Sequence, residues 1–175
     1  CSQALEVLQV DIAALLTSNP LPKGDRVAVL TVSGGAGIWG ADTVALQGLQ
    51  VPELSAGIQT GIRKLLPSYG AAGNPIDVTA QGVHSGGLQN SIDLLSVSDE
   101  VDAILVVLSL SSDTRVLLKR AELKPVLSAR RKPIVFYSYT LPSNFARWFG
   151  IADAGLPAIA PSIGNFPVRD LGFMA

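Results

Sequence analysis

Charge, cysteine and histidine are scarce in this sequence of 175 residues. Charged residues make up 15% of the chain, whereas roughly 25% is usual in soluble domains. This low share predicts surface that other domains or subunits cover, although a large parallel sheet also raises apolar content. The single cysteine, Cys1, excludes an internal disulfide and predicts a cytoplasmic protein. One cysteine and one histidine exclude a zinc site made of these residues, and we expect no metal site.

Several classes of partner are excluded by other absences. The net charge of −1 offers no basic surface to nucleic acid. No run approaches about 18 apolar residues, so we expect no membrane span. No charged segment followed by an apolar one opens the chain, so we expect no signal peptide. Because the chain begins at Cys1 rather than at a methionine, we expect it to be a fragment of a longer protein.

Strand-like and helix-like segments alternate along the chain. Apolar residues at helical spacing predict a helix over 4–16, and prolines soon after it predict its end. We therefore divide the chain into a helix and linker at 1–22 and a single domain at 23–175. Apolar runs predict strands over 26–32, 101–110, 133–139 and 157–160, with either 51–54 or 76–79 as a further strand. Helical patterns cover 38–49, 55–66, 85–97, 114–131 and 143–154.

This alternation is typical of βαβ units and of a parallel sheet. Right-handed crossovers leave few arrangements of the strands. We predict an α/β fold, a three-layer, doubly wound, flavodoxin-like parallel sheet with strand order 2-1-3-4-5 rather than 3-2-1-4-5. Ligands of such sheets bind beyond the carboxyl ends of the strands, where the strand order reverses.

Two loops are expected to face each other at that point. Backbone N–H groups where the first loop enters its helix would attract a phosphoryl or carboxylate group, and its glycines would allow a tight turn with positive φ. A glycine turn that merely packs the helix on the sheet is the structural alternative. The predicted phosphate-binding residues are Gly34, Gly35, Ala36 and Gly37, and the predicted substrate-binding residues are Ser33 with Ser111, Ser112 and Asp113 of the second loop. For the second loop, helix capping is the structural alternative.

The same glycines also fit a dinucleotide-binding pattern. Residues 35–40 read G-x-G-x-x-G, and Glu53 lies 18 positions after Gly35, where an acidic residue would bind a ribose hydroxyl. Trp39 is bulky for a helix that must lie close to a strand, which weighs against this interpretation. A dinucleotide-binding domain therefore stays an alternative.

Four motifs in order resemble a known family. RVAVLTVSGGAGIWGAD, LQVPELS, LPSYGAAGNPIDVT and VDAILVVL are similar to the ADP-forming acyl-CoA synthetases, which include ADP-forming acetate–CoA ligase and are relatives of succinyl-CoA synthetase. The resemblance runs from Leu21 to Leu110 and continues more weakly through KPIVFY and AGLP. The matched domain resembles the carboxyl-terminal, flavodoxin-like domain of the succinyl-CoA synthetase β subunit.

The resemblance implies the reaction acyl-CoA + ADP + phosphate ⇌ acid + CoA + ATP, with magnesium. It also implies sister CoA-binding, phosphohistidine and ATP-grasp domains in an oligomeric enzyme, and a helix amino terminus at 35–37 that points at the phosphohistidine. Ser33 stands where the family often has asparagine, and residues 111–113 stand where a relative has a glycine-rich substrate loop. Asn74 and Asp77 match the family's Asn-Pro-x-Asp, which we interpret as structural.

The chain alone is expected to lack catalytic residues, to hold no cofactor tightly and not to turn over. His84, its one histidine, lies outside the four motifs, and we expect it to be exposed rather than to carry the phosphoryl group. A non-catalytic regulatory module that responds to CoA or acyl-CoA is the alternative from another functional class.

Overall fold

The described residues centre on a four-stranded parallel sheet. The computed structural model describes residues 16–17, 19–108, 125, 128–129 and 131–138. The described strands follow the order β2-β1-β3-β4, and every pair of neighbours is parallel. This confirms the predicted α/β fold and the order 2-1-3-4, while the expected strand at 157–160 lies outside the described residues. The strands are β1 (Val27–Thr31), β2 (Ile76–Asp77), β3 (Ala103–Leu108) and β4 (Ile134–Ser138).

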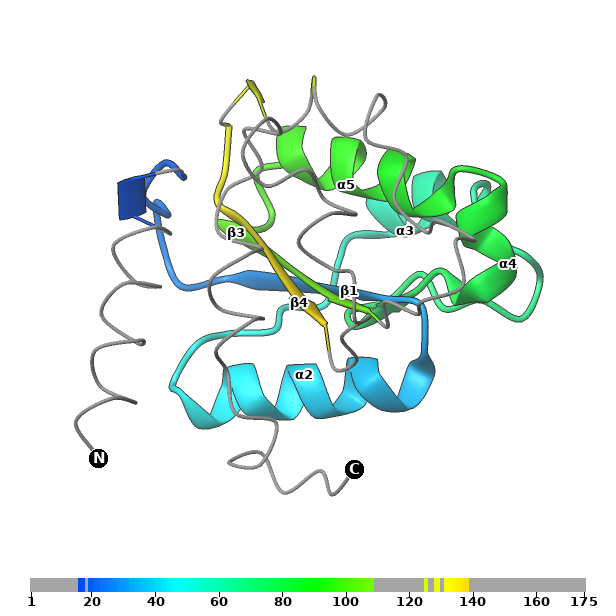
Figure 1. The fold of residues 1–175 in the computed structure, drawn as a ribbon, viewed down its shortest axis with the longest axis horizontal. Helices are drawn as coiled ribbons and strands as arrows, with labels where there is room; N and C mark the ends of the chain where they lie inside the picture. The colour runs from blue at the N-terminus through cyan, green and yellow to red at the C-terminus, as the bar shows by residue number, and fades with distance from the viewer. Residues whose placement is uncertain (1–15, 18, 109–124, 126–127, 130, 139–175) are drawn as a thin grey trace, which may run out of the picture.

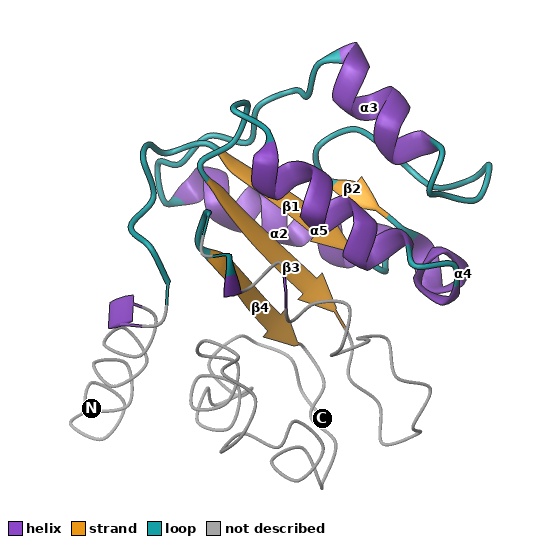
Figure 2. Cartoon of the chain, turned by 90° about the horizontal axis from the view of Figure 1, so that it is seen from above, coloured by secondary structure: helices purple, strands orange, loops and turns teal. Residues whose placement is uncertain are grey.

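Helices cover both faces of the sheet (Figure 1). One helix, α2, lies on one face, and the other described helices lie on the opposite face, where α5 crosses the sheet (Figure 2). None of the described helices combines the length and apolar character that a membrane span requires. The helices are α2 (Gly34–Leu46), α3 (Ala56–Arg63), α4 (Thr79–His84) and α5 (Gly87–Val97).

Three features of the structure differ from the sequence-based expectations. Helix α2 begins at Gly34 rather than at residue 38, so the expected glycine turn is the first turn of the helix. Strand β2 comes from 76–77, whereas 51–54 forms no strand. The six-residue helix α4 was not expected, because the glycine at position 82 weakens its helical pattern. The expected helices at 4–16, 114–131 and 143–154 lie largely or wholly outside the described residues.

The strands are hydrophobic on both faces because each face meets helices. Leu30, Ile104 and Phe136 belong to the larger apolar cluster, which includes the buried residues of α5. Val29 and Val107 point the other way and pack with Val44 of α2. This pattern is that of a central parallel sheet, which explains the near-continuous apolar runs in the sequence.

An ion pair joins the amino ends of β1 and β3, far from the ends where ligands bind in this fold. The guanidinium of Arg26 donates to both carboxylate oxygens of Asp102, from Nε at 2.9 Å and from Nη2 at 3.0 Å. The backbone N–H of Arg26 also donates to Asp102, at 3.2 Å. These hydrogen bonds hold the pKa of the Asp102 carboxyl below its ordinary value of 3.8.

Replacing Asp102 by asparagine should therefore destabilise the chain in a pH-dependent way. Because the folded state lowers the Asp102 pKa, the stabilisation is complete above pH 3.8 and is lost as the pH falls toward the lower pKa of the folded protein. Denaturant unfolding from pH 7 to pH 3 should show a difference in the free energy of unfolding between the parent chain and Asp102→Asn that shrinks only in the acid range. Asp99→Asn, which removes a neighbouring exposed carboxylate, is the control. A difference that stays constant down to pH 3 would contradict the role of the pair.

Candidate functional site

The predicted phosphate-binding residues form the first turn of α2, at the carboxyl end of β1. Ser33 is the N-cap, with extended backbone at φ −149° and ψ 119°, and its carbonyl accepts from the N–H of Gly37 at 3.0 Å. Among the described residues, only Gly48 and Gly86 are glycines with positive φ. The expectation that positive φ explains the glycines at 34–37 is therefore wrong.

Close packing explains two glycines of α2. A Cβ atom on Gly37 would lie 2.7 Å from Thr31 Cγ2, and one on Gly40 would lie 3.1 Å from Val107 Cγ2. Both positions are buried. A side chain on Gly37 would collide with Thr31, and one on Gly40 would fit only if Val107 and Val29 shifted. The structural alternative is thus correct for Gly37.

Packing does not explain Gly35, and at Gly34 the nearby carboxylate of Asp77 is the one neighbour. Both glycines are exposed, and a Cβ atom on Gly35 would meet nothing within 4 Å. A Cβ on Gly34 would meet one atom, Asp77 Oδ2, at 3.2 Å. Glycine within a helix costs about 1 kcal/mol relative to alanine. Neither the fold nor the backbone conformation requires glycine at position 35.

The start of α2 is also left without the usual side-chain cap. The side chain of Ser33 makes no cap hydrogen bond, whereas Ser55, at the same position before α3, accepts from the N–H of Ile58 at 3.4 Å. The backbone of Ser33 is held by Thr31, whose hydroxyl accepts from the Ser33 N–H and donates to its carbonyl, each at 3.1 Å. The first N–H groups of a helix have no intrahelical partner. The first N–H groups of α2 therefore receive no hydrogen bond from the side chain of Ser33.

A carboxylate borders this helix terminus. Asp77, at the end of β2, accepts a hydrogen bond from the N–H of Thr79 through Oδ1 at 2.9 Å, and its Oδ2 lies where it would meet a Cβ atom on Gly34. Thr79 has a φ of 60°, which is rare for a β-branched residue, and the hydrogen bond to Asp77 supports that conformation. Asp77 thus places negative charge beside the positive end of α2, where the helix dipole favours it.

Asn74, the other polar residue of the Asn-Pro-x-Asp motif, serves the fold. Its side chain accepts from the N–H of Val29 at 2.8 Å and donates to the carbonyl oxygens of Val27 at 2.9 Å and Pro52 at 3.1 Å. The peptide bond between Asn74 and Pro75 is cis. The side-chain amide of Asn74 completes the hydrogen bonding of β1 where β2 is too short to do so. This agrees with the structural interpretation of the motif.

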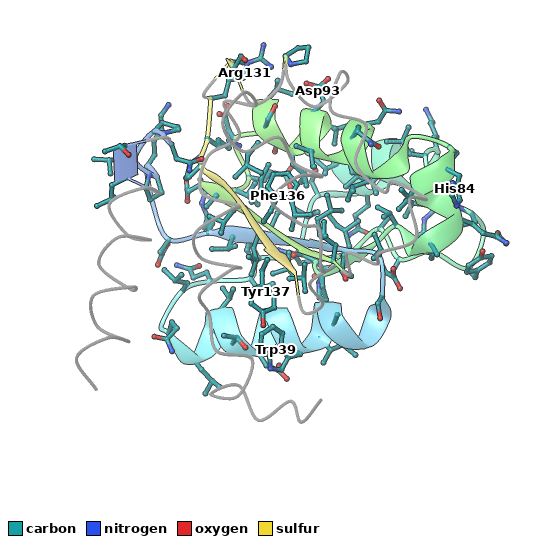
Figure 3. The ribbon with its side chains drawn as sticks, viewed as in Figure 1. Trp39, His84, Asp93, Arg131, Phe136 and Tyr137 are labelled. Atoms are coloured by element: carbon teal, nitrogen blue, oxygen red, sulfur yellow. The ribbon has the colours of Figure 1, made fainter. Side chains whose placement is uncertain are left out.

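The other candidate residues of the sequence analysis lie away from the start of α2 or outside the described residues. Ser111, Ser112 and Asp113 lie outside the described residues. His84 is the exposed last residue of α4 and points away from the sheet (Figure 3). No group of three or more histidine, cysteine, aspartate or glutamate residues in the described part of the chain could hold a metal ion.

Glu53 lies near the opposite end of the sheet, which weighs against dinucleotide binding. The carbonyl of the preceding residue, Pro52, shares the Asn74 amide with Val27, at the start of β1. Ser55, two residues after Glu53, donates its N–H to the side chain of Glu100, which precedes β3, at 2.7 Å. Both contacts place Glu53 near the amino ends of the strands. A ribose held at the carboxyl ends of the strands would need an acidic residue at that end.

Comparisons with known proteins point to one family. A model described as Ligase-CoA domain matches residues 27–117. The alpha subunit of ADP-forming acetate–CoA ligase II from Pyrococcus furiosus is 32% identical over 90 residues, which are 51% of this chain and 20% of that protein. ADP-forming acetate–CoA ligase II from Archaeoglobus fulgidus is 29% identical over 98 residues, which are 54% of this chain and 15% of that protein. The chain thus spans a fifth or less of the length of these relatives.

Two solved structures share the fold. Dinucleotide-forming acetyl-coenzyme A synthetase 1 from Ca. Korarchaeum cryptofilum, in complex with phosphate and ADP, matches with a TM-score of 0.62 and 21% identity over 93% of this chain and 35% of that chain. PH0766 from Pyrococcus horikoshii OT3 matches with a TM-score of 0.62 and 22% identity, over 84% of this chain and 35% of that chain. At this level of identity, the likeness shows the fold alone.

Replacing Asp77 by asparagine should strengthen anion binding at the start of α2. Asparagine keeps an oxygen that can accept from the N–H of Thr79. It removes the negative charge of Asp77, which repels a phosphate at the start of α2. At low ionic strength we expect phosphate affinity, measured from the amide chemical shifts of Gly34 and Gly35, to rise about threefold to tenfold.

The control for this variant is Asp42→Asn. Asp42 is an exposed carboxylate within the same helix, so its loss changes the net charge equally without altering the start of the helix. If both variants raise the affinity to the same extent, or neither does, Asp77 does not border an anion site.

Proposed function

The chain belongs to the Ligase-CoA domain family, and from that membership we propose that it is one domain of a larger ADP-forming acid–CoA ligase. The named relatives from Pyrococcus and Archaeoglobus are ADP-forming acetate–CoA ligases, which supports this class of reaction. The reaction of the whole enzyme would be acyl-CoA + ADP + phosphate ⇌ acid + CoA + ATP. A histidine of a sister domain would carry the phosphoryl group between the acyl-CoA site and the nucleotide site.

This domain would bind the phosphoryl group of that histidine, or of an acyl phosphate, at the first turn of α2. The N–H groups of Gly34, Gly35 and Ala36 would donate to phosphoryl oxygens, and the helix dipole would favour their negative charge. Such donors are fixed in place before the reaction, so they stabilise charge without reorganising. No residue of this domain is assigned to bond making, and nucleotide, CoA and magnesium are assigned to the sister domains.

The observation that carries this proposal is Gly35. It is exposed, it has an ordinary helical φ, and a Cβ atom there would touch nothing in the protein. A glycine that the fold does not need is explained by a ligand that must approach the backbone closely. Its position in an uncapped first turn makes that ligand an anion.

Two neighbouring side chains suit a phosphorylated imidazole. The hydroxyl of Ser33 is not used as a cap and lies beside the first turn, where it could donate to a phosphoryl oxygen. The carboxylate of Asp77 adds an acceptor next to these donors. A phosphorylated imidazole needs both, because its phosphoryl group accepts hydrogen bonds while its ring can donate one.

Gly35→Ala should separate function from stability. In the parent ligase, we expect the variant to lower kcat/KM for ATP formation from acetyl-CoA, ADP and phosphate by about tenfold or more, because a methyl group blocks the approach to the N–H groups. In the 175-residue chain, the same substitution should leave thermal stability unchanged or raise it slightly, because alanine is the better helix former.

Gly57→Ala is the matched control for this experiment. Gly57 is the second residue of α3, as Gly35 is of α2, and a Cβ atom there would meet only Ser55 Oγ, at 3.8 Å. The Gly57→Ala variant should have a thermal stability equal to or slightly above that of the unmodified chain, and it should leave ATP formation unchanged. Full activity in Gly35→Ala would refute the phosphoryl site. Absence of any ADP-forming ligase activity in the unmodified parent protein would refute the assignment of the reaction.

A further inference from the structure

The outward face of α2 carries exposed apolar side chains. Ile38 is 61% exposed and Leu46 is 84% exposed, and Ala45 is exposed beside them. These residues follow one another at helical spacing, so they share the face of α2 that lies opposite the buried Gly40 and Val44. We call Ile38, Ala45 and Leu46 the apolar stripe.

The helices on the other face of the sheet present polar residues at comparable places. The exposed residues of α5 include Asn90 and Asp93, and those of α3 include Thr60 and Arg63. An outer helix normally turns such residues toward solvent. In α2, by contrast, Asp42 is the one charged residue. The outward face of α2 is therefore suited to contact with a partner rather than with water.

The composition of α2 favours a protein partner over a lipid membrane. Helices that lie on membranes carry lysine and arginine on their polar face, and α2 contains neither. Its 13 residues are also fewer than the roughly 20 that a membrane span needs. An apolar protein surface is the partner that fits the stripe.

The apolar stripe begins next to the candidate phosphoryl site. Ile38 lies three residues after the exposed Gly35, and Leu46 lies eight residues further along the same face. One turn of helix rises about 5.4 Å. A protein that brings an imidazole to the N–H groups of the first turn therefore has the surface around that imidazole above Ile38. The site and the stripe thus require the same partner.

On the proposed function, we propose that the apolar stripe is the docking surface for the sister domain that carries the phosphorylated histidine. The matched segments are 20% and 15% of the two named relatives, so ligases of this kind contain further domains. The docked domain would present apolar side chains to Ile38 and Leu46. It would also present a hydrogen-bond donor or a cation to the carboxylate of Asp42, which lies on the same face and would lose its water. The stripe would position the histidine and take no part in bond making.

Leu46→Glu and Val97→Glu form a matched pair that tests this docking. Leu46 is the last residue of α2, and Val97, which is 58% exposed, is the last residue of α5, so the new carboxylate meets the same end of each helix. In the parent ligase, we expect Leu46→Glu to slow phosphorylation of the histidine by acetyl-CoA and phosphate about tenfold or more, because docking would bury the charge. Val97→Glu should keep this rate within about twofold.

Phosphorylation of the same histidine by ATP is the internal control. Both variants should keep this rate, because the nucleotide site is assigned to a sister domain. Equal rates of the acetyl-CoA reaction in the two variants would overturn the docking proposal. A loss in Leu46→Glu that is equally large with ATP would overturn it too, because the stripe would then not serve the site at α2.

Photo-cross-linking identifies the occupant of the stripe without any need for activity. A benzophenone amino acid at position 46 of the parent ligase should cross-link to the domain whose histidine is labelled by ATP, and the same amino acid at position 97 should not. Cross-links to a second copy of this domain, to residues 1–175 of the same chain, or to no protein at all would each overturn the proposal. Loss of activity in Gly35→Ala combined with any of these results would leave the phosphoryl site standing. Full activity in Gly35→Ala with the expected cross-link would refute the phosphoryl site and leave the docking surface standing.

Discussion

The close approach of α2 to β1 and β3 is the constraint on which the candidate site depends. Gly37 and Gly40 let the helix lie against Thr31 and Val107; a Cβ on Gly37 would collide with Thr31, and one on Gly40 would crowd Val107. This contact fixes both the position and the direction of the helix axis. Its amino terminus is thereby held at the carboxyl end of β1, the edge of the sheet where this fold binds ligands. Gly37 and Gly40 therefore position the helix, whereas Gly34 and Gly35 leave its first turn open.

The loop before β2 connects the fold to this site. Asn74 supplies the hydrogen bonds that β1 would otherwise lack at its edge, and three residues later Asp77 borders the start of α2. One short motif thus completes the strand and also places a charge at the helix terminus. This is why the motif cannot be classed simply as structural or functional. Asn74 belongs to the fold, while Asp77 ties down its loop with one oxygen and faces the candidate site with the other.

The helices and strands that depend on hydrophobic pattern were predicted most reliably from the sequence. The strand at β1 and the helix α3 were both expected, because an apolar run and apolar residues at helical spacing are local signals. The choice between 51–54 and 76–79 stayed open, because two residues of β2 carry too little pattern to decide it. The sequence misplaces the start of α2, because glycines directly after a strand indicate a turn. Their helical φ and the space around Gly35 depend on tertiary packing, which a single sequence does not contain.

The charge arrangement at the start of α2 fits a group that must be passed on rather than retained. A helix terminus alone favours any anion, including free phosphate, and tight binding of such a ground state does not speed its transfer. A carboxylate at the border weakens the binding of loose anions. A phosphoryl group attached to an imidazole would be affected less, because a ring N–H could donate to that carboxylate. On the proposed function, Asp77 would therefore help the site to discriminate between the carried phosphoryl group and free anions, which is a matter of differential rather than maximal affinity.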